Sequence, residues 1–222
     1  MKPKQSKKTS SKQTLINFVL DETGSMCVCK EATISGFNEY INSLRKRKEK
    51  ILFTLTKFDS EKIEVVHDGI DIKKVENLNE DTYIPGAMTP LYDAIATTIK
   101  KTEKKQGKKK MSVLCVIMTD GEENASKEYT RDKIFKLIKK KVKDKWTFVF
   151  LGANQDAWAT GQAIGLHRGN VMNYKVTQTK AAYGNLAAQT CSFLSSGSKQ
   201  SIDFCVDKSN KDKKIKKGEV KC

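Results

Sequence analysis

The stretch LINFVLDETGS (residues 15–25) joins an apolar run to a short polar segment. The apolar part, LINFVL, is interrupted by a single asparagine, which is the pattern of a strand buried on both faces. Asp21, Thr23 and Ser25 then place a carboxylate and two hydroxyls at every second position. Because side chains of an extended segment alternate between two sides, these three oxygens are expected to point the same way at the tip of the strand. The stretch therefore predicts a ligand site at the end of a central strand.

Short apolar runs and amphipathic segments alternate along the rest of the chain. The segment 62–72 alternates apolar and polar residues after a short turn, so it is predicted to be an antiparallel edge strand. The alternation of strands with helices predicts a three-layer α/β/α fold with a Rossmann-like, doubly wound, mostly parallel sheet. Strands are expected at 15–20, 51–58, 62–72, 112–118, 146–152 and 170–174, and helices at 31–48, 89–101, 130–143, 155–165 and 178–195.

Three loops that follow these strands carry oxygen-bearing side chains. Ligands of open parallel sheets bind beyond the carboxyl ends of the strands, where the strand order reverses, so these loops are expected to meet. The residues in question are Asp21, Thr23, Ser25, Thr89 and Asp120. All five are hard oxygen donors and neither histidine lies in these loops, which favours Mg²⁺, or alternatively Mn²⁺, over zinc or copper.

Three of these side chains also have an ordinary structural interpretation. Thr89 can be the N-cap of the following helix, with Pro90 at the first helical position. Asp21 and Asp120 can cap turns at strand ends. The joint occurrence of the five residues nevertheless favours a metal site. Asp93 is expected to stabilise the first turn of its helix rather than to bind the metal.

Length and composition limit the class of protein. With 222 residues and 38% hydrophobic residues, the chain can form one sizeable core. No apolar run approaches the roughly 20 residues that cross a bilayer, and no signal-peptide pattern follows the basic N-terminus. Six cysteines are too few for a disulfide scaffold in a chain of this length. We expect an intracellular, cytoplasmic protein without a membrane span, or a virion-associated one if the source is viral.

The net charge of +16 is unevenly distributed. Residues 1–13 carry five lysines and no acid, and residues 207–222 carry seven lysines against three acids. The lysine-rich run 100–110 is expected to be a loop. Lysine outnumbers arginine 38 to 4, which favours diffuse charge over base recognition, although the tails can contact nucleic acid or another polyanion. The expected organisation is one domain at 14–198 between basic tails at 1–13 and 199–222.

The three loops match the motifs of a known family. The strings DETGSM, TPLYDA and MTDGEENAS resemble the metal-ion-dependent adhesion site of von Willebrand factor type A (vWA) domains, read as D-x-S-x-S, a distant Thr and a distant Asp. The strings GFNEYINSLR, GANQDAWATGQAIG and NYKVTQTKAAYGNL resemble stand-alone intracellular vWA domains of bacteria and their phages. The resemblance covers about residues 14–195.

The resemblance implies both a fold and a function. It implies that Thr23 and Ser25 bind Mg²⁺ directly, that Thr89 does so directly or through water, and that Asp21 and Asp120 act largely through waters. It further implies a non-enzymatic protein-interaction module, which can belong to a larger assembly. In that module the bound ion coordinates an Asp or Glu carboxylate of a partner protein.

Two residues depart from the family pattern. Thr23 replaces the usual serine, keeps the hydroxyl and adds a methyl group, so metal binding is expected to survive in weakened form. Glu22 stands where related sequences often have arginine or a small residue. Its negative charge beside the site is expected to repel an acidic partner.

Two other functions remain open on the sequence alone. DETGS also resembles the D-x-T-G-T loop of the haloacid-dehalogenase superfamily, in which Asp21 would be the nucleophile of a Mg-dependent phosphatase or phosphotransferase. The regular helix predicted directly after this loop, and the string TPLYDA, do not fit that mechanism. The second alternative is a structural protein that its basic tails tether to a polyanion.

Overall fold

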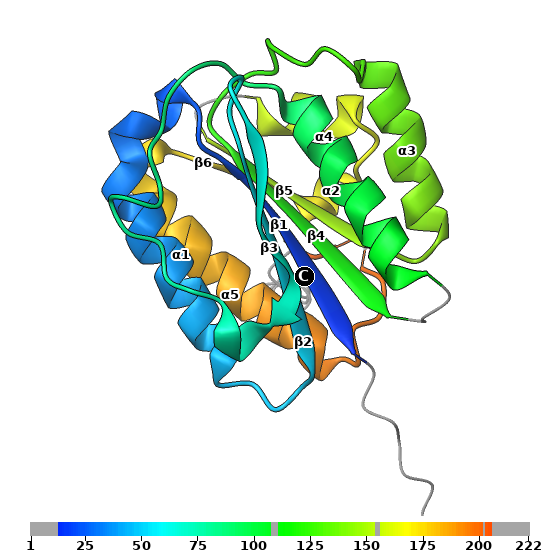
Figure 1. Ribbon diagram of the computed structural model, residues 1–222. Helices are drawn as coiled ribbons and strands as arrows, with labels where there is room; N and C mark the ends of the chain where they lie inside the picture. Colours follow the sequence, from blue (N-terminus) through cyan, green and yellow to red (C-terminus); the bar gives the residue numbers. More distant parts are fainter. Residues whose placement is uncertain (1–12, 108–110, 154–155, 202, 206–222) are drawn as a thin grey trace, which may run out of the picture.

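One six-stranded sheet lies between two layers of helices in the computed structural model, which describes residues 13–107, 111–153, 156–201 and 203–205 (Figure 1). The strands are β1 (Thr14–Asp21), β2 (Ile51–Phe58), β3 (Ile63–Asp71), β4 (Ser112–Thr119), β5 (Thr147–Ala153) and β6 (Val171–Tyr174). Their order in the sheet is β3-β2-β1-β4-β5-β6, and of these described strands only β3 runs antiparallel. The predicted mostly parallel sheet with one antiparallel edge strand is confirmed.

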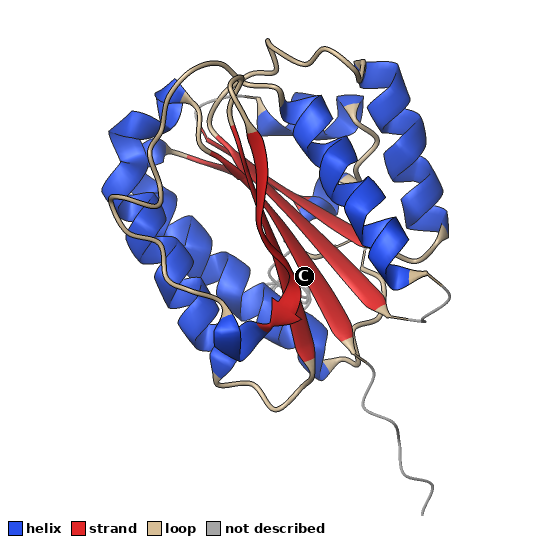
Figure 2. Ribbon diagram, viewed as in Figure 1, coloured by secondary structure: helices blue, strands red, loops and turns tan. Residues whose placement is uncertain are grey.

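The helices cover both faces of this sheet (Figure 2). The core between helices and sheet falls into two clusters, so that α1 and α5 pack on one face and α2, α3 and α4 on the other. None of the described helices is both long enough and apolar enough to cross a bilayer. Their bounds are α1 (Lys30–Arg45), α2 (Leu91–Gln106), α3 (Arg131–Lys143), α4 (Ala157–Ala163) and α5 (Thr179–Ser195).

Strand β1 is the centre of the fold, and all eight of its residues are buried. Its side chains alternate between the two cores, with Phe18 facing α1 and α5 and Val19 facing α2. The asparagine that interrupts the apolar run, Asn17, accepts a hydrogen bond from Thr102 of α2 at 3.1 Å. The polar residue therefore links the central strand to a covering helix, and the strand stays buried.

The hairpin of β2 and β3 forms one edge of the sheet. Asp59 makes the turn, because its Oδ1 accepts hydrogen bonds from the amides of Glu61 and Lys62 at 2.8 Å each. Burial alternates along β3, as expected for a strand with one covered face. The predicted edge strand at 62–72 is therefore confirmed in nearly the same bounds.

Helix α2 differs from the prediction at both ends. It begins at Leu91, and Pro90 is its N-cap residue rather than its first helical residue. The expectation of a loop over 100–110 is wrong for residues 100–106, which continue the helix. The helix persists through this lysine-rich segment because Thr102 still faces the core.

Residues beyond α5 continue to contact the domain. The Gln200 amide donates to the carbonyl oxygen of Val142 at 2.6 Å. Phe204 is 4% exposed, and its ring packs 6.0 Å from that of Phe193. These contacts extend past the predicted boundary at residue 198. Apart from Gln13, residues 199–201 and residues 203–205, the predicted basic tails lie outside the described part of the chain.

The contact between α1 and α5 depends on a glycine. A Cβ added at Gly36 would lie 2.4 Å from Cδ2 of Tyr183, a fully packed ring of α5. Gly36→Ala is therefore expected to lower the free energy of unfolding by about 1–3 kcal/mol through overpacking. Gly184→Ala, in α5, is the matched control: nothing lies within 4 Å of its added Cβ, so a gain of about 0.5–1 kcal/mol is expected. Urea unfolding measures both, and equal stabilities of the two variants would contradict the packing.

Candidate metal centre

The candidate site lies where the strand order of the sheet reverses. From β1 the chain leads to β2 on one side, whereas β4 pairs with β1 on the other side and leads to β5. In the parallel register of β1 and β4, Leu20 lies opposite Met118, so both strands end at the same level. The loops that begin at Asp21 and Asp120 therefore emerge side by side, which is the usual place of a ligand in such sheets.

Four of the five predicted side chains meet through their oxygens. Ser25 Oγ donates to Asp120 Oδ1 at 2.5 Å and lies 3.3 Å from Thr23 Oγ1. Thr89 Oγ1 donates to Thr23 Oγ1 at 3.3 Å. Residues from three separate loops thus share one hydrogen-bonded cluster, as the sequence predicted.

Asp21 lies beneath this cluster and is fully buried. Its Oδ1 accepts from the Thr23 amide at 2.8 Å, and its Oδ2 accepts from Thr119 Oγ1 at 2.5 Å. Burial raises the pKa of Asp21 to about 6, although the hydrogen bonds from Thr119 and Thr23 act in the opposite direction. Burial likewise raises the pKa of Asp120, and the hydrogen bond from Ser25 opposes that shift. The site therefore holds two partly desolvated carboxyls, whose ionised forms a nearby cation would stabilise.

The spacing of these oxygens fits a small divalent ion. Mg–O bonds of about 2.0–2.1 Å that meet at right angles separate neighbouring ligand oxygens by roughly 2.9 Å. The separations of 2.5 and 3.3 Å in the cluster bracket this value. A Cβ added at Gly121 would lie 2.9 Å from Thr89 Oγ1 and 3.3 Å from Ser25 Oγ, so glycine keeps the space beside these hydroxyls open.

The donor set also limits which metal is suitable. Within the described part of the chain, no three His, Cys, Asp or Glu side chains are grouped as metal ligands. The candidate ligands are instead two carboxylates and three hydroxyls, with water completing the shell. This set suits Mg²⁺ or Mn²⁺, which accept oxygen ligands and retain waters, and does not suit zinc.

The N-cap interpretation of Thr89 is wrong. The N-cap residue of α2 makes no side-chain capping bond. Instead, the backbone amide of Tyr92, in the first turn, donates to Glu123 Oε2 at 2.9 Å and to Ser126 Oγ at 3.1 Å. The Thr89 backbone is fixed by Asn124, whose Oδ1 accepts from the Thr89 amide at 2.8 Å. The Thr89 hydroxyl is therefore available to the cluster.

Asp93 lies where it was predicted and has a second role. Although Asp93 lies in the first turn of α2, its carboxylate accepts hydrogen bonds from the backbone amides of Lys127, Glu128 and Tyr129, at 2.7 to 3.3 Å. The side chain thus holds the segment that leads into α3. It remains outside the oxygen cluster, as expected.

The expectation for Glu22 is wrong as well. The side chain is 1% exposed, so its carboxylate is not presented to solvent beside the oxygen cluster. Its Oε1 accepts from Lys57 Nζ and from the Ile84 amide, each at 2.8 Å. The ion pair with Lys57 offsets the negative charge that was expected to repel acidic partners.

Several supporting residues were not assigned a role from the sequence. Thr119 and Asn124 fix Asp21 and Thr89, and the Tyr83 hydroxyl donates to the backbone oxygen of Asp21 at 2.6 Å. Thr119 and Asn124 lie in the polar segment TDGEEN, from which only Asp120 was assigned to the site. The polarity of this segment was the signal by which Thr119 and Asn124 could have been found. No pattern pointed to Tyr83, which reaches the site from a loop of irregular structure.

Comparisons with known proteins bear on the fold. No family model and no curated protein matches the sequence. Among solved structures, proximal thread matrix protein 1 from the mussel byssus is 14% identical with a TM-score of 0.57, over 82% of this chain and 47% of that one. The manganese-loaded TRAP protein of Plasmodium vivax is 17% identical with a TM-score of 0.54, over 77% and 72%. The SpRpn10 VWA domain is 9% identical with a TM-score of 0.53, over 78% and 94%.

The strand order, the antiparallel edge strand and these similarities together show a vWA-like α/β fold. The chain spans about half the length of the mussel protein. At such low identities the likeness concerns the fold, and the function has to be argued from the site itself.

The hydroxyl of Thr119 is expected to be important for stability. Thr119→Val removes the donor to Asp21 Oδ2 and leaves a buried carboxylate oxygen without that partner. A loss of about 1.5–3 kcal/mol in the free energy of unfolding is expected, as for hydrogen bonds to charged groups. Thr119→Ser keeps the hydroxyl and is the control. Chemical denaturation of both variants tests the claim, and a valine variant as stable as the serine variant would contradict it.

Proposed function

We propose that this protein is a non-enzymatic interaction module that binds a partner protein through a Mg²⁺ ion, or Mn²⁺, held by Asp21, Thr23, Ser25, Thr89 and Asp120. The observation that carries the proposal is the convergence of oxygens from three loops, at ligand-like separations, beside a glycine that leaves room for the ion. A role in protein interaction also agrees with the vWA-type fold.

Each side chain has a distinct part in the proposed site. Thr23 and Ser25 would be direct ligands, because their hydroxyls lie in the middle of the cluster. Thr89 would bind directly or through water. Asp21 and Asp120 would supply negative charge, largely through bound waters. Asp21 suits that role because both of its oxygens already accept hydrogen bonds from Thr23 and Thr119.

A carboxylate is the partner group that best suits such an ion. The bound cation would supply an electrophilic position at which an Asp or Glu side chain of the partner replaces a water. The contact between the carboxylate and the cation would be charge-assisted, because the two groups carry opposite charges. Among the structurally similar proteins, the TRAP structure is manganese-loaded, which supports the choice of a divalent ion for this chain.

The phosphatase alternative is disfavoured by the burial of Asp21. A nucleophilic carboxylate has to reach the phosphorus atom, but Asp21 is fully buried and both its oxygens are hydrogen-bonded. Assay with a chromogenic phosphate ester tests this directly. Turnover that Asp21→Asn abolishes would replace the interaction proposal with phosphoryl transfer.

Metal binding is expected to stabilise the protein. Mg²⁺ or Mn²⁺ at about 100 times the dissociation constant raises the free energy of unfolding by about 2.7 kcal/mol if it binds only the folded state. Ser25→Ala removes a hydroxyl ligand and should reduce that gain. Ser43→Ala, on the surface of α1, is the matched control. Thermal unfolding with added metal and with EDTA gives the result, and an unchanged response in Ser25→Ala would refute the assigned ligand.

Partner binding is expected to require the metal. In affinity capture, the proteins retained by the full chain should be lost with EDTA and with Ser25→Ala. Binding through the basic tails should instead fall with rising salt and persist in EDTA, because it depends on screened charges. A retained set that neither EDTA nor Ser25→Ala changes would mean that recognition does not use this site.

Intracellular, cytoplasmic location is part of the same proposal.

A further inference from the structure

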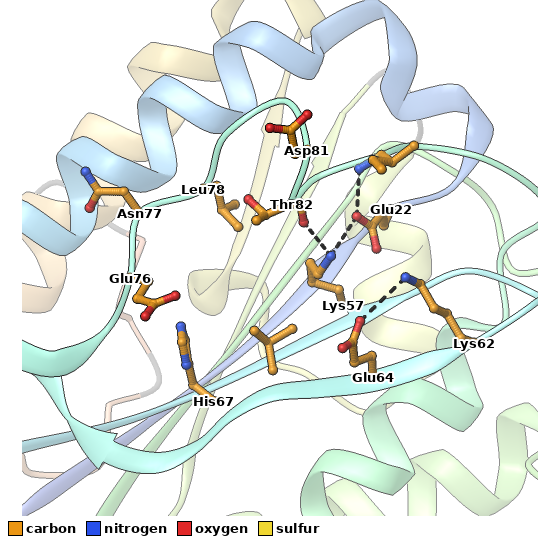
Figure 3. Close-up of a pocket in the computed structure, with 12 residues that line it drawn as sticks. Glu22, Lys57, Lys62, Glu64, His67, Glu76, Asn77, Leu78, Asp81 and Thr82 are labelled. Atoms are coloured by element: carbon orange, nitrogen blue, oxygen red, sulfur yellow. Dashed lines mark hydrogen bonds and ion pairs between the residues drawn. The ribbon is translucent and has the colours of Figure 1, made fainter.

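A pocket lies next to the candidate metal centre, between β3 and the loop of residues 75–84 (Figure 3). Its volume is about 260 Å³, slightly below the roughly 300 Å³ at which small-molecule pockets begin. A pocket of this size suits a single side chain. The lining residues that matter here are Glu22, Lys57, Glu64, Glu76, Asp81 and Ile84.

The charge of this pocket is opposite to that of the chain. Four carboxylates line it, namely Glu22, Glu64, Glu76 and Asp81, against two lysines, so its formal charge is −2 in a chain of net charge +16. Lys57 pairs with Glu22, and Lys62 lies 3.5 Å from Glu64. The remaining carboxylates, on Glu76 and Asp81, are exposed at the rim. The pocket therefore favours a cationic ligand.

One buried acceptor on the pocket wall has no partner. Glu22 Oε1 bonds both Lys57 and the Ile84 amide, but Glu22 Oε2 is buried without a hydrogen bond from any described residue. Figure 3 shows Glu22 beside Lys57, with dashed lines on one of its oxygens only. An unpartnered buried carboxylate oxygen is costly, and a donor that enters the pocket would satisfy it.

The rim also offers apolar surface. Ile84 is 63% exposed and Val66 is 39% exposed, and both line the pocket. A side chain with an aliphatic stem and a charged head would cover them while its head reaches the carboxylates. Arginine fits best, because its planar guanidinium presents several donors at once and is more weakly hydrated than an ammonium group.

We infer that this pocket binds an arginine side chain of a partner protein, with Glu22 Oε2 and the rim carboxylates of Glu76 and Asp81 as acceptors. The pocket adjoins the candidate metal centre, because the Gly86 amide bonds the Glu22 carbonyl at 2.9 Å and the Gly24 amide bonds the Ala87 carbonyl at 3.1 Å. One partner could thus present an arginine here and a carboxylate at the metal. That last statement rests on the proposed function, whereas arginine binding does not.

The test is a titration of the ¹⁵N-labelled full chain with N-acetyl-arginine methylamide in the presence of EDTA. Saturable amide shifts are expected at Thr82, Ile84 and Val66. The citrulline analogue, which is of similar shape but uncharged, should bind about tenfold more weakly because it lacks charge-assisted hydrogen bonds. The lysine analogue should also bind more weakly. No saturable shift, shifts elsewhere only, or equal binding of either analogue would overturn the inference.

Variants locate the binding. Glu22→Gln removes the buried charge and should abolish the shifts; since it also leaves Lys57 without its ion pair, a folding defect would make it uninformative on its own. The double variant Glu76→Gln, Asp81→Asn changes only exposed rim residues and should weaken binding several-fold, so it tests the inference in either case. Asp132→Asn, exposed on α3, is the control. Rim variants that bind like the control would overturn the inference.

The two proposals fail separately. The titration is done without metal, so its failure leaves the proposed function untouched. Conversely, if partner capture does not depend on the metal, a positive titration still supports arginine binding. Arginine binding that survives in EDTA together with metal-dependent partner capture would support both.

Discussion

A buried carboxylate at the end of the central strand determines the arrangement of the whole candidate site. Asp21 is the last residue of β1, which has strands on both sides in the sheet. Its two carboxylate oxygens accept hydrogen bonds from the Thr23 amide and the Thr119 hydroxyl. These two hydrogen bonds fix the first loop against the end of β4. Because desolvation makes the buried charge unfavourable, any change that removes one of these donors destabilises the loops that meet there.

Beside it, the ion pair of Glu22 and Lys57 has a different effect. The two side chains are nearly inaccessible, with 2% and 6% of their surfaces exposed. Breaking such a pair by removing one partner typically costs about 3–5 kcal/mol, because the other charge stays buried. The pair therefore holds the end of β2 to the first loop of the site. Two adjacent acidic residues thus have separate roles, Asp21 facing the oxygen cluster and Glu22 the neighbouring pocket.

The fold and the convergence of the five oxygen-bearing side chains could be predicted from the sequence, because both depend on local patterns; metal binding by these side chains stays a prediction. Apolar runs and helical spacing located each strand and helix, and the three loop motifs located the five oxygens. The errors concern contacts between distant residues. The expectation for Glu22 failed because Lys57 comes from the neighbouring strand. The alternative role of Thr89 as an N-cap failed because Glu123 and Ser126 bond the first amides of α2 instead. No local pattern records which distant side chain will fill such a position.

The capping of α2 has a consequence for the order in which the chain folds. The residues that bond its first amides, Glu123 and Ser126, lie about thirty positions downstream, beyond β4. During synthesis, which proceeds from the N-terminus, this helix leaves the ribosome before its cap exists. The start of α2, and with it the position of Thr89, becomes final only after β4 has paired with β1 and the following loop has turned back. The oxygen cluster therefore cannot be complete before the segment up to Ser126 has been synthesised.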